Sequence, residues 1–295
     1  MGRVGGYIVN ALPGIKVRNC NATEENCSDD RKIHKVSQPY LAHSKDNISI
    51  TMTTTFSEHQ YDMRYPLGIE HHWWTHARNQ LLAKLLFRES GSTDSLLEVG
   101  CGRGVVVKSL KDSGFNIHGV ELAEVKPMDG AQLLVDSGTD AFELPIERRS
   151  EVTGILMLDV IEHLPEPEQF LKKLESSFPK LAVVIVTVPA CPELWSENDK
   201  FCGHYRRYSL ETLEQLSKDL NWTTKNAGYF FRLPYLPMRL VSLLGIHPAA
   251  KLNPPGKATR SLHRLISAAC QLEEAVLPRR IRGSSAYAVY YPGRA

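Results

Sequence analysis

The amino-acid sequence predicts an α/β fold with a doubly wound, mostly parallel sheet, and two observations lead to this fold class. Between residues 95 and 188, short apolar segments with strand character alternate with helical segments. At the first strand-to-helix junction, glycines stand at alternate positions, which is typical of loops that bind nucleotide-type ligands. With 42% apolar residues, the 295-residue chain can also bury the core that such a sheet needs.

The expected elements follow from periodicity along the chain. A first helix is expected where apolar residues three and four positions apart share one face, with Gly91 beyond its end: Trp74, Ala77, Leu81, Leu82 and Leu85. We then expect a strand from 95, a helix over 105–113, a strand over 115–120, a weak helix near 131, a strand over 154–158, a helix over 168–178 and a strand over 181–188. A third strand before Asp140 has the weakest signal, because residues 136–139 have almost no strand propensity.

Composition divides the chain into two parts. Residues 1–60 are rich in Ser, Thr, Asn and charge without sustained periodicity, so we expect a polar N-terminal tail or cap. Residues 61–295 form one predicted domain. Within it, the prolines, aromatics and bases of residues 190–208 suit a loop over a pocket, and residues 230–280 suit a basic and apolar lid insertion.

Composition also argues against several classes of protein. The longest apolar run, residues 181–188, is far shorter than the roughly 20 residues that a membrane span needs. No charged-then-apolar leader opens the sequence. The six cysteines lack the paired spacing of a zinc site or a disulfide framework. We therefore expect a cytoplasmic protein.

The glycine-rich loop carries the most functional information. An apolar strand over residues 96–99 runs into Gly100, Gly102 and Gly104, which can turn with positive φ and let a ligand approach the main chain. The next helix points its N–H groups at that ligand. One residue separates the last two glycines, whereas two do so in the dinucleotide fingerprint. Glu98 would repel a pyrophosphate but suits a ligand with a cationic amine.

Further acids stand near the ends of later strands. The second strand ends on Glu121, where a carboxylate can accept hydrogen bonds from two ribose hydroxyls. Asp140 and Ala141 follow the third strand, and the fourth ends on Leu158 and Asp159. In order and spacing, these segments resemble the class I S-adenosylmethionine-dependent methyltransferases.

The resemblance implies a Rossmann-like, seven-stranded sheet and S-adenosyl-L-methionine as cofactor. It also implies roles for particular residues. The cofactor-binding positions are, in chain order, Arg78 at the carboxylate, Glu98 at the amine, Gly100, Cys101, Gly102 and Gly104 beneath the cofactor, Glu121 and Leu122 at the ribose, Asp140 and Ala141 at the adenine, and Leu158 and Asp159 beside the methyl-bearing sulfur.

A narrower resemblance covers roughly residues 70–295. Through the segments 72–78, 203–208 and 273–291, the chain is similar to a small-molecule subgroup that includes methyltransferase domain 23 and the ubiquinone-pathway O-methyltransferases. This implies methylation of a hydroxyl oxygen on a sugar, glycolipid or secondary metabolite. Methylation at nitrogen or carbon, a noncatalytic cofactor-binding module and a nicotinamide oxidoreductase remain alternatives, although the last would leave Glu98 without a role.

Oxygen methylation requires that the acceptor lose a proton, and two histidines are candidate bases. His163 follows the fourth strand and His204 lies in the predicted pocket loop, and imidazole titrates near neutral pH. Either could instead be a structural residue or an acceptor contact. We expect no metal. The alternative is that Asp159, Glu162 and His163, three and four positions apart, hold a divalent cation that lowers the pKa of the hydroxyl.

The C-terminal region is strongly basic. From residue 231 to the end, ten Lys and Arg residues stand against two acids, although the whole chain carries only +2. This asymmetry can attract an anionic acceptor, a carrier or a lipid surface. Residues 229–245 add apolar surface suited to peripheral membrane contact and a lipid-linked acceptor. A solvated basic face over the lid is the alternative. Nucleic acid is not expected as a partner, because no base-stacking module accompanies the charge.

Overall fold

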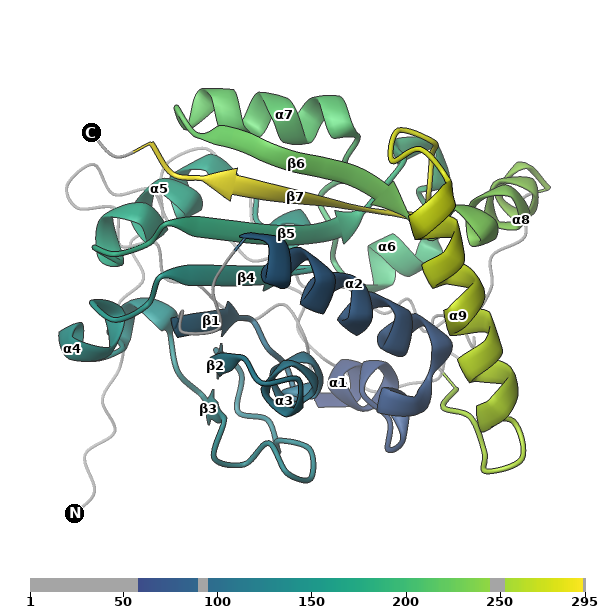
Figure 1. Ribbon diagram of the computed structural model, residues 1–295, viewed down its shortest axis with the longest axis horizontal. Helices are drawn as coiled ribbons and strands as arrows, with labels where there is room; N and C mark the ends of the chain where they lie inside the picture. Colours follow the sequence, from purple (N-terminus) through teal and green to yellow (C-terminus); the bar gives the residue numbers. More distant parts are fainter. Residues whose placement is uncertain (1–57, 90–94, 245–252, 294–295) are drawn as a thin grey trace, which may run out of the picture. The chain divides into compact units, whose positions relative to one another are not determined.

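The computed structural model describes residues 58–89, 95–244 and 253–293 (Figure 1). Most of the predicted N-terminal tail and the position of Gly91 lie outside the described residues. Helix α1 (Glu58–Arg64) begins within the last residues of that predicted tail. In the described part of the chain, no helix is long and apolar enough to span a membrane.

The described strands form one seven-stranded sheet in the order β3-β2-β1-β4-β5-β7-β6. The first five strands in this order run parallel, whereas β7 is antiparallel to both β5 and β6. This arrangement confirms the predicted doubly wound, mostly parallel sheet. The strands are β1 (Ser95–Val99), β2 (Asn116–Glu121), β3 (Val135–Ser137), β4 (Gly154–Leu158), β5 (Val183–Pro189), β6 (Thr223–Phe230) and β7 (Ser285–Tyr291).

Helices cover both faces of the sheet (Figure 1). On one face, α2 (Trp73–Glu89), α3 (Val105–Asp112) and α9 (Arg260–Val276) pack against apolar strand residues such as Leu96 and Leu156. The other face carries α5 (Pro167–Ser177) and α7 (Leu210–Asp219), which pack against neighbouring strand residues. Since successive strand residues point to opposite faces, both layers bury apolar side chains of every central strand. The remaining helical elements are η1 (Ile69–His71), η2 (Ala141–Glu143), α4 (Ile146–Arg149), η3 (Ile161–His163), η4 (Pro192–Leu194), α6 (Glu197–Phe201) and α8 (Arg232–Leu243).

Some predicted segments differ in the structure. The helix expected near residue 131 is wrong, because residues 122–134 contain bends, turns and irregular backbone in place of a helix, and Gly130 has a φ of 82°. The third strand exists, but only Val135 of its three residues is buried. The predicted pocket loop over residues 190–208 contains η4 and α6, and a capping box between Ser196 and Asp199 starts α6. The basic region over 230–280 contains the helices α8 and α9.

Candidate active site

The glycine-rich loop between β1 and α3 packs closely against neighbouring side chains. Gly100, Gly102 and Gly104 have φ values of 75°, 54° and 78°, which side-chain-bearing residues rarely adopt. A Cβ at Gly102 would stand 2.7 Å from the ring of Tyr65, and one at Gly104 would stand 2.6 Å from Val135. Only glycine therefore fits these positions without displacing a neighbour.

Glu121 ends β2 beside this loop. Its side chain is buried, and its carboxylate accepts hydrogen bonds from the N–H groups of Gly102 at 2.8 Å and Ala123 at 3.0 Å. The phenol of Tyr61 donates a third hydrogen bond at 3.0 Å. Because a carboxylate offers about four acceptor positions, Glu121 keeps capacity for another donor.

A cluster of charged side chains lies at the adjoining strand ends. Arg78 of α2 is buried, donates to Asp159 at 2.5 Å and lies 4.2 Å from the centroid of the Trp74 ring. Asp159 has a φ of 57°, a strained backbone state that is concentrated at functional sites. Glu98 is buried, and one of its oxygens has no hydrogen-bond partner. Burial raises the pKa of Glu98 to about 8, and the positive charge of Arg78 opposes this shift.

Two tyrosines adjoin these charges, and the sequence analysis did not assign them a role. The buried side chain of Tyr61, in α1, reaches Glu121, and Tyr65 follows the same helix. Burial raises the pKa of Tyr65, and the charges of Arg78, Glu121 and Glu98 also act on it. A signal for the pair was present in the sequence, because residues four positions apart share one face of a helix.

Helix α1 also connects the two loops of the site. On one side, Arg103 of the glycine-rich loop donates to the carbonyl oxygen of Tyr65 at 3.2 Å. On the other side, Gln60 donates to the carbonyl oxygen of Phe201 at 2.7 Å. Arg64 donates to the side chain of Asn198 at 2.8 Å. Helix α1 therefore spans from the glycine-rich loop to α6 in the predicted pocket loop.

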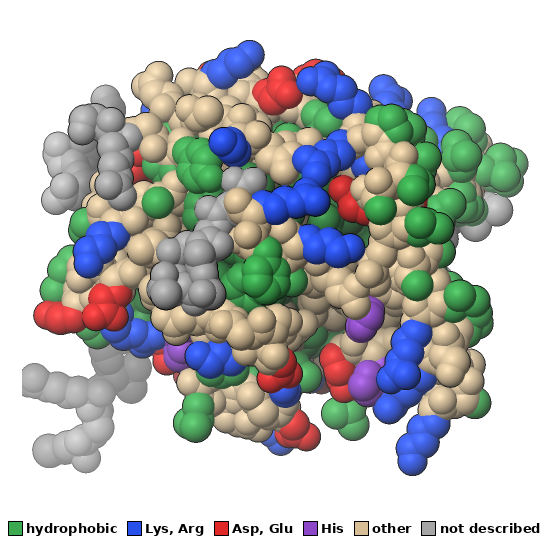
Figure 2. Space-filling view, in the orientation of Figure 1, with side chains coloured by type: hydrophobic (Ala, Val, Ile, Leu, Met, Phe, Trp, Pro, Cys, Tyr) green, Lys and Arg blue, Asp and Glu red, His purple; other side chains and the backbone are tan. Residues whose placement is uncertain are grey.

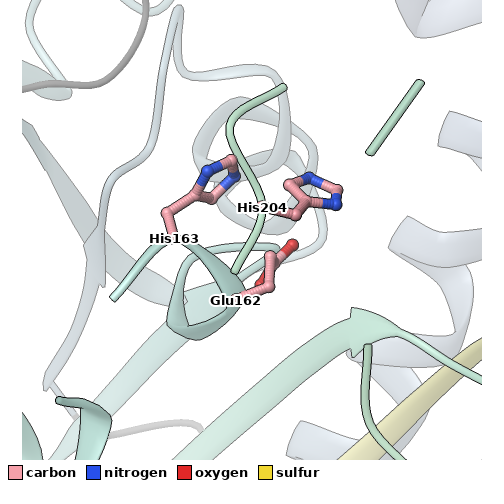
Figure 3. A group of neighbouring side chains, drawn as sticks. All are labelled: Glu162, His163 and His204. Atoms are coloured by element: carbon pink, nitrogen blue, oxygen red, sulfur yellow. The ribbon is translucent and has the colours of Figure 1, made fainter. Parts of the chain in front are cut away.

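Three side chains beyond β4 form a group suited to a metal ion. Glu162, His163 and His204 each offer one ligand atom, and these atoms lie within 4.8 Å of one another (Figure 3). The imidazole rings of His163 and His204 meet edge to face with centroids 4.7 Å apart. Glu162 is fully buried, neither of its oxygens has a hydrogen-bond partner, and burial raises its pKa. We name this group the Glu–His cluster.

Asp199 of α6 fixes the orientation of His204. Its fully buried carboxylate contacts Nδ1 of His204 at 2.9 Å and accepts a hydrogen bond from Arg207 at 2.8 Å. Burial opposes a charge on His204, but the hydrogen bonds to Asp199 and Cys202 and the negative charge of Glu162 together outweigh it and raise the pKa of His204 to about 9. Burial and the neighbouring His204 lower the pKa of His163 to about 3. The two predicted bases therefore have opposite pKa shifts.

Several residues singled out in the sequence lie in or beside this group of side chains. The metal group given as an alternative to no metal differs in one member, because Asp159 pairs with Arg78 and His204 stands with Glu162 and His163. Cys101 and Leu158 are buried, and Leu122 is half-buried.

Asp140 and Ala141 lie on the loop after β3, which is attached to the end of β2. The N–H of Thr139 donates to the carbonyl oxygen of Glu121 at 2.9 Å. Asp140 accepts a hydrogen bond from the N–H of Phe142 at 2.9 Å and so caps η2, while Ala141 is buried. The predicted adenine-binding pair thus stands next to the predicted ribose-binding acid.

Curated relatives of the chain are O-methyltransferases. It is 27% identical over 116 residues to a ubiquinone biosynthesis O-methyltransferase of Aromatoleum aromaticum, covering 34% of this chain and 49% of that protein. The similarity to the protein of the same name from Leptothrix cholodnii is 26% over 123 residues and covers 35% and 52%. The chain spans about half the length of these relatives.

Solved structures with a similar architecture are also methyltransferases. A SAM dependent methyltransferase from Archaeoglobus fulgidus has a TM-score of 0.44 and 17% identity, covering 72% of this chain and 94% of that one. A geranyl diphosphate C-methyltransferase from Streptomyces coelicolor has a TM-score of 0.46 and 16% identity, covering 74% and 82%.

The strongest comparison is at the level of the family. The family model described as a methyltransferase domain matches residues 72–225, which is more than half of the chain. The matched region includes the glycine-rich loop, Glu121, Asp159 and the whole Glu–His cluster. This finding confirms the resemblance drawn from the glycine-rich loop and the strand ends: the chain belongs to the methyltransferase-domain family.

Proposed function

We propose that the protein is an S-adenosyl-L-methionine-dependent methyltransferase that methylates a hydroxyl oxygen of a small molecule. The observation that carries this proposal is the buried, unpartnered oxygen of Glu98 between the glycine-rich loop and Arg78. A carboxyl group in that position suits the cationic amine of the cofactor. Membership of the methyltransferase-domain family and the names of the curated relatives support the same reaction.

The residues present fit this cofactor. The backbone at Gly102 has a positive φ and carries no Cβ, so a ligand can reach the main chain once the ring of Tyr65 moves away. Glu121 has about one acceptor position left for a ribose hydroxyl. Asp140 and Ala141 would contact the adenine, and Arg78 would contact the carboxylate. The cofactor supplies a methyl group on a sulfonium, which is already a good leaving group. The protein therefore contributes chiefly by alignment of the acceptor, which can supply several kcal/mol of the barrier.

The Glu–His cluster supports a divalent cation as the group that activates the acceptor. One carboxylate and two imidazoles are suitable ligands for divalent metals, and the unpartnered oxygens of Glu162 would gain a partner. Asp199 holds His204 through Nδ1, which leaves Nε2 for the cation. A bound cation would lower the pKa of the acceptor hydroxyl. The second candidate is that His163 or His204 takes the proton directly. With its pKa raised to about 9, His204 would do so only after losing its own proton.

Chelation separates these two modes of activation. Exhaustive removal of divalent metal should abolish turnover, and Mg²⁺ or Mn²⁺ should restore it. Full activity in chelator would favour a histidine base. In that case His204→Asn should lower kcat by about 10²–10⁴ with cofactor affinity unchanged. An increase in KM with kcat intact would make His204 an acceptor contact.

The proposal extends to the kind of molecule that carries the methylated hydroxyl. We assign a hydroxyl on a sugar, glycolipid or secondary metabolite, with a lipid-linked acceptor favoured by the basic residues and the apolar stretch over 229–245. Acceptors of each kind should be screened with methyl-labelled cofactor, and mass spectrometry should locate the methyl group. A methyl group found on nitrogen or carbon would contradict the proposed oxygen methylation. Cofactor binding without turnover of any acceptor would indicate a noncatalytic module.

Calorimetry tests the cofactor itself. Wild type should bind S-adenosylmethionine and not NADH. Gly102→Val should abolish binding, because a branched side chain would strain the positive φ and occupy the space that the ring of Tyr65 fills now and that a ligand would need. Gly256→Ala is the matched control, since nothing lies within 4 Å of its added Cβ. Circular dichroism of both variants shows whether the fold survives. Unchanged affinity in a folded Gly102→Val variant would contradict the assignment.

A further inference from the structure

The outer sides of α8 and α9 expose leucine side chains that nothing in the described chain covers. On α8, Leu236 and Leu243 are 72% and 67% exposed. On α9, Leu265 and Leu272 are 68% and 63% exposed. We name the region the α8–α9 surface, defined by Leu236, Leu240, Leu243, Leu262, Leu265 and Leu272.

These leucines recur at helical spacing. Their separations of three, four or seven residues place them on one face of each helix. The two helices contact each other, and Figure 2 shows hydrophobic side chains gathered over both of them at the right of the molecule. Single exposed leucines are ordinary, but a continuous apolar patch of this kind marks an interaction site.

Cations flank both ends of this surface. Lys257 and Arg264 are exposed at the beginning of α9, and Arg280 and Arg282 are exposed just after its end. Figure 2 shows Lys and Arg side chains below and above the hydrophobic group. The apolar face is therefore bounded by positive charge at both ends.

The two acids in this described region are used inside the protein. Glu273 is buried and accepts hydrogen bonds from the N–H groups of Arg232 and Leu233, at 2.6 and 2.7 Å. Glu274 pairs with the guanidinium of Arg232 at 2.7 Å. Neither acid therefore offsets the exposed charges of Lys257, Arg264 and Arg280, whereas Arg282 pairs with Glu193 at 2.7 Å. The margins of the surface thus keep a net positive charge.

We infer that the α8–α9 surface docks on an anionic lipid membrane. Leucines on one helix face insert at the boundary of head groups and acyl chains, while flanking Lys and Arg pair with anionic head groups. A second copy of the chain is a poorer occupant. A two-fold contact would bring the same cationic margins together without acids to oppose them.

The docking surface connects to both sides of the candidate site. On α8, Tyr235 donates to the carboxylate of Glu193 at 2.9 Å, at the start of the predicted pocket loop. On α9, Ser267 contacts His76 of α2 at 2.9 Å, two residues from Arg78. Docking would thus hold the candidate site next to the helices that face the membrane. The inference goes beyond the proposed reaction and does not depend on it.

Vesicle flotation of the full chain tests the inference. The protein should float with vesicles of phosphatidylcholine and phosphatidylglycerol, and much less with phosphatidylcholine alone. Salt should weaken the binding. The double variant Leu236→Asp, Leu265→Asp should lose more than about tenfold in affinity, since it removes apolar contact and adds like charge to the anionic surface. Arg264→Gln and Arg280→Gln should each lose about fivefold.

Leu133→Asp is the matched control. Leu133 is 92% exposed and lies in the turn before β3, so this change should leave vesicle binding intact. Circular dichroism should show that all variants are folded. Absence of anionic vesicle binding, or equal loss in Leu133→Asp, would overturn the inference. So would a dimer that Leu265→Asp dissociates in a protein that binds no vesicles. Because flotation needs no cofactor, its failure would leave the proposed methyl transfer standing.

Discussion

At the scale of single residues, Glu98 links cofactor binding to proton release. Its pKa of about 8 means that the buried carboxyl is mostly protonated at pH 7. A cationic amine beside it would favour the charged form and lower this pKa. We therefore expect cofactor binding at pH 7 to release close to one proton. Calorimetry in buffers of different ionisation enthalpy measures this number.

The matched variant is Glu98→Gln, which keeps size and polarity but cannot ionise. It should bind the cofactor more weakly and without the proton release seen in wild type. The release should also fade above pH 8, where the carboxyl of the free protein is already charged. Proton release that persists in Glu98→Gln would belong to another group and would contradict the role of this residue.

Glu121 is tested by affinity. Glu121→Ala should cost about 1.5–3 kcal/mol of cofactor affinity, the range for hydrogen bonds to a charged group. Since the same carboxylate also accepts from Gly102, Tyr61→Phe serves as a comparison that removes one donor and leaves the loop intact. If ribose hydroxyls use Glu121, Tyr61→Phe should change the dissociation constant much less. A loss below a few tenths of a kcal/mol in Glu121→Ala would place the ribose elsewhere.

Single residues could be predicted from the sequence where a glycine or an acid stands at or near the end of an apolar strand. Gly102, Glu98 and Glu121 all lie at the ends of strands with clear apolar patterns, so their common edge could be predicted. The contact of Asp199 with His204 could not, because it depends on how α6 folds within the predicted loop. Tyr65 reaches the site only through the packing of α1.

At the scale of elements, α1 acts as a cover over the glycine-rich loop. The ring of Tyr65, just after α1, stands where a ligand approaching Gly102 would lie, so we expect cofactor entry to require that this ring move. Tyr65→Ala should therefore raise the association rate constant measured by stopped-flow fluorescence. Asp62→Asn removes an exposed pair with Arg103 and should act in the same direction, more weakly. Unchanged association rates in both folded variants would show that α1 does not limit entry.

Whether a helix or strand could be predicted depended on how clearly its apolar residues repeat along the chain. The parallel strands β4 and β5 are buried on both faces and read as continuous apolar runs, so they were predicted correctly. The prediction of a helix near residue 131 was wrong because the apolar residues there belong to a turn beside Gly130. Helices α8 and α9 were not predicted because their leucines are exposed while the buried positions are mostly polar, such as Arg232 and Glu273, so no apolar face marks the side that faces the core.

At the scale of the whole molecule, the parallel part of the sheet gathers the site at one edge. Arg78 comes from α2, Glu121 from β2 and Asp159 from the end of β4, and these segments meet only because the strands share a direction. The Glu–His cluster adds His204 from a segment beyond β5. A ligand bound at this edge therefore contacts separate parts of the chain. Its binding free energy should increase the free energy of unfolding of the whole domain.

Thermal unfolding makes this linkage measurable without any acceptor. If the Glu–His cluster holds a divalent cation, Mn²⁺ at 100 times its dissociation constant should add about 2.7 kcal/mol of stability. At about 2–4 °C per kcal/mol for a domain of this size, the unfolding temperature should rise by roughly 5–10 °C. Glu162→Gln should remove this shift, because an amide is a poor ligand for the cation. Glu166→Gln, which alters a nearby exposed acid, should retain it. Equal shifts in wild type and Glu162→Gln would place the cation away from the cluster and leave a histidine to activate the acceptor.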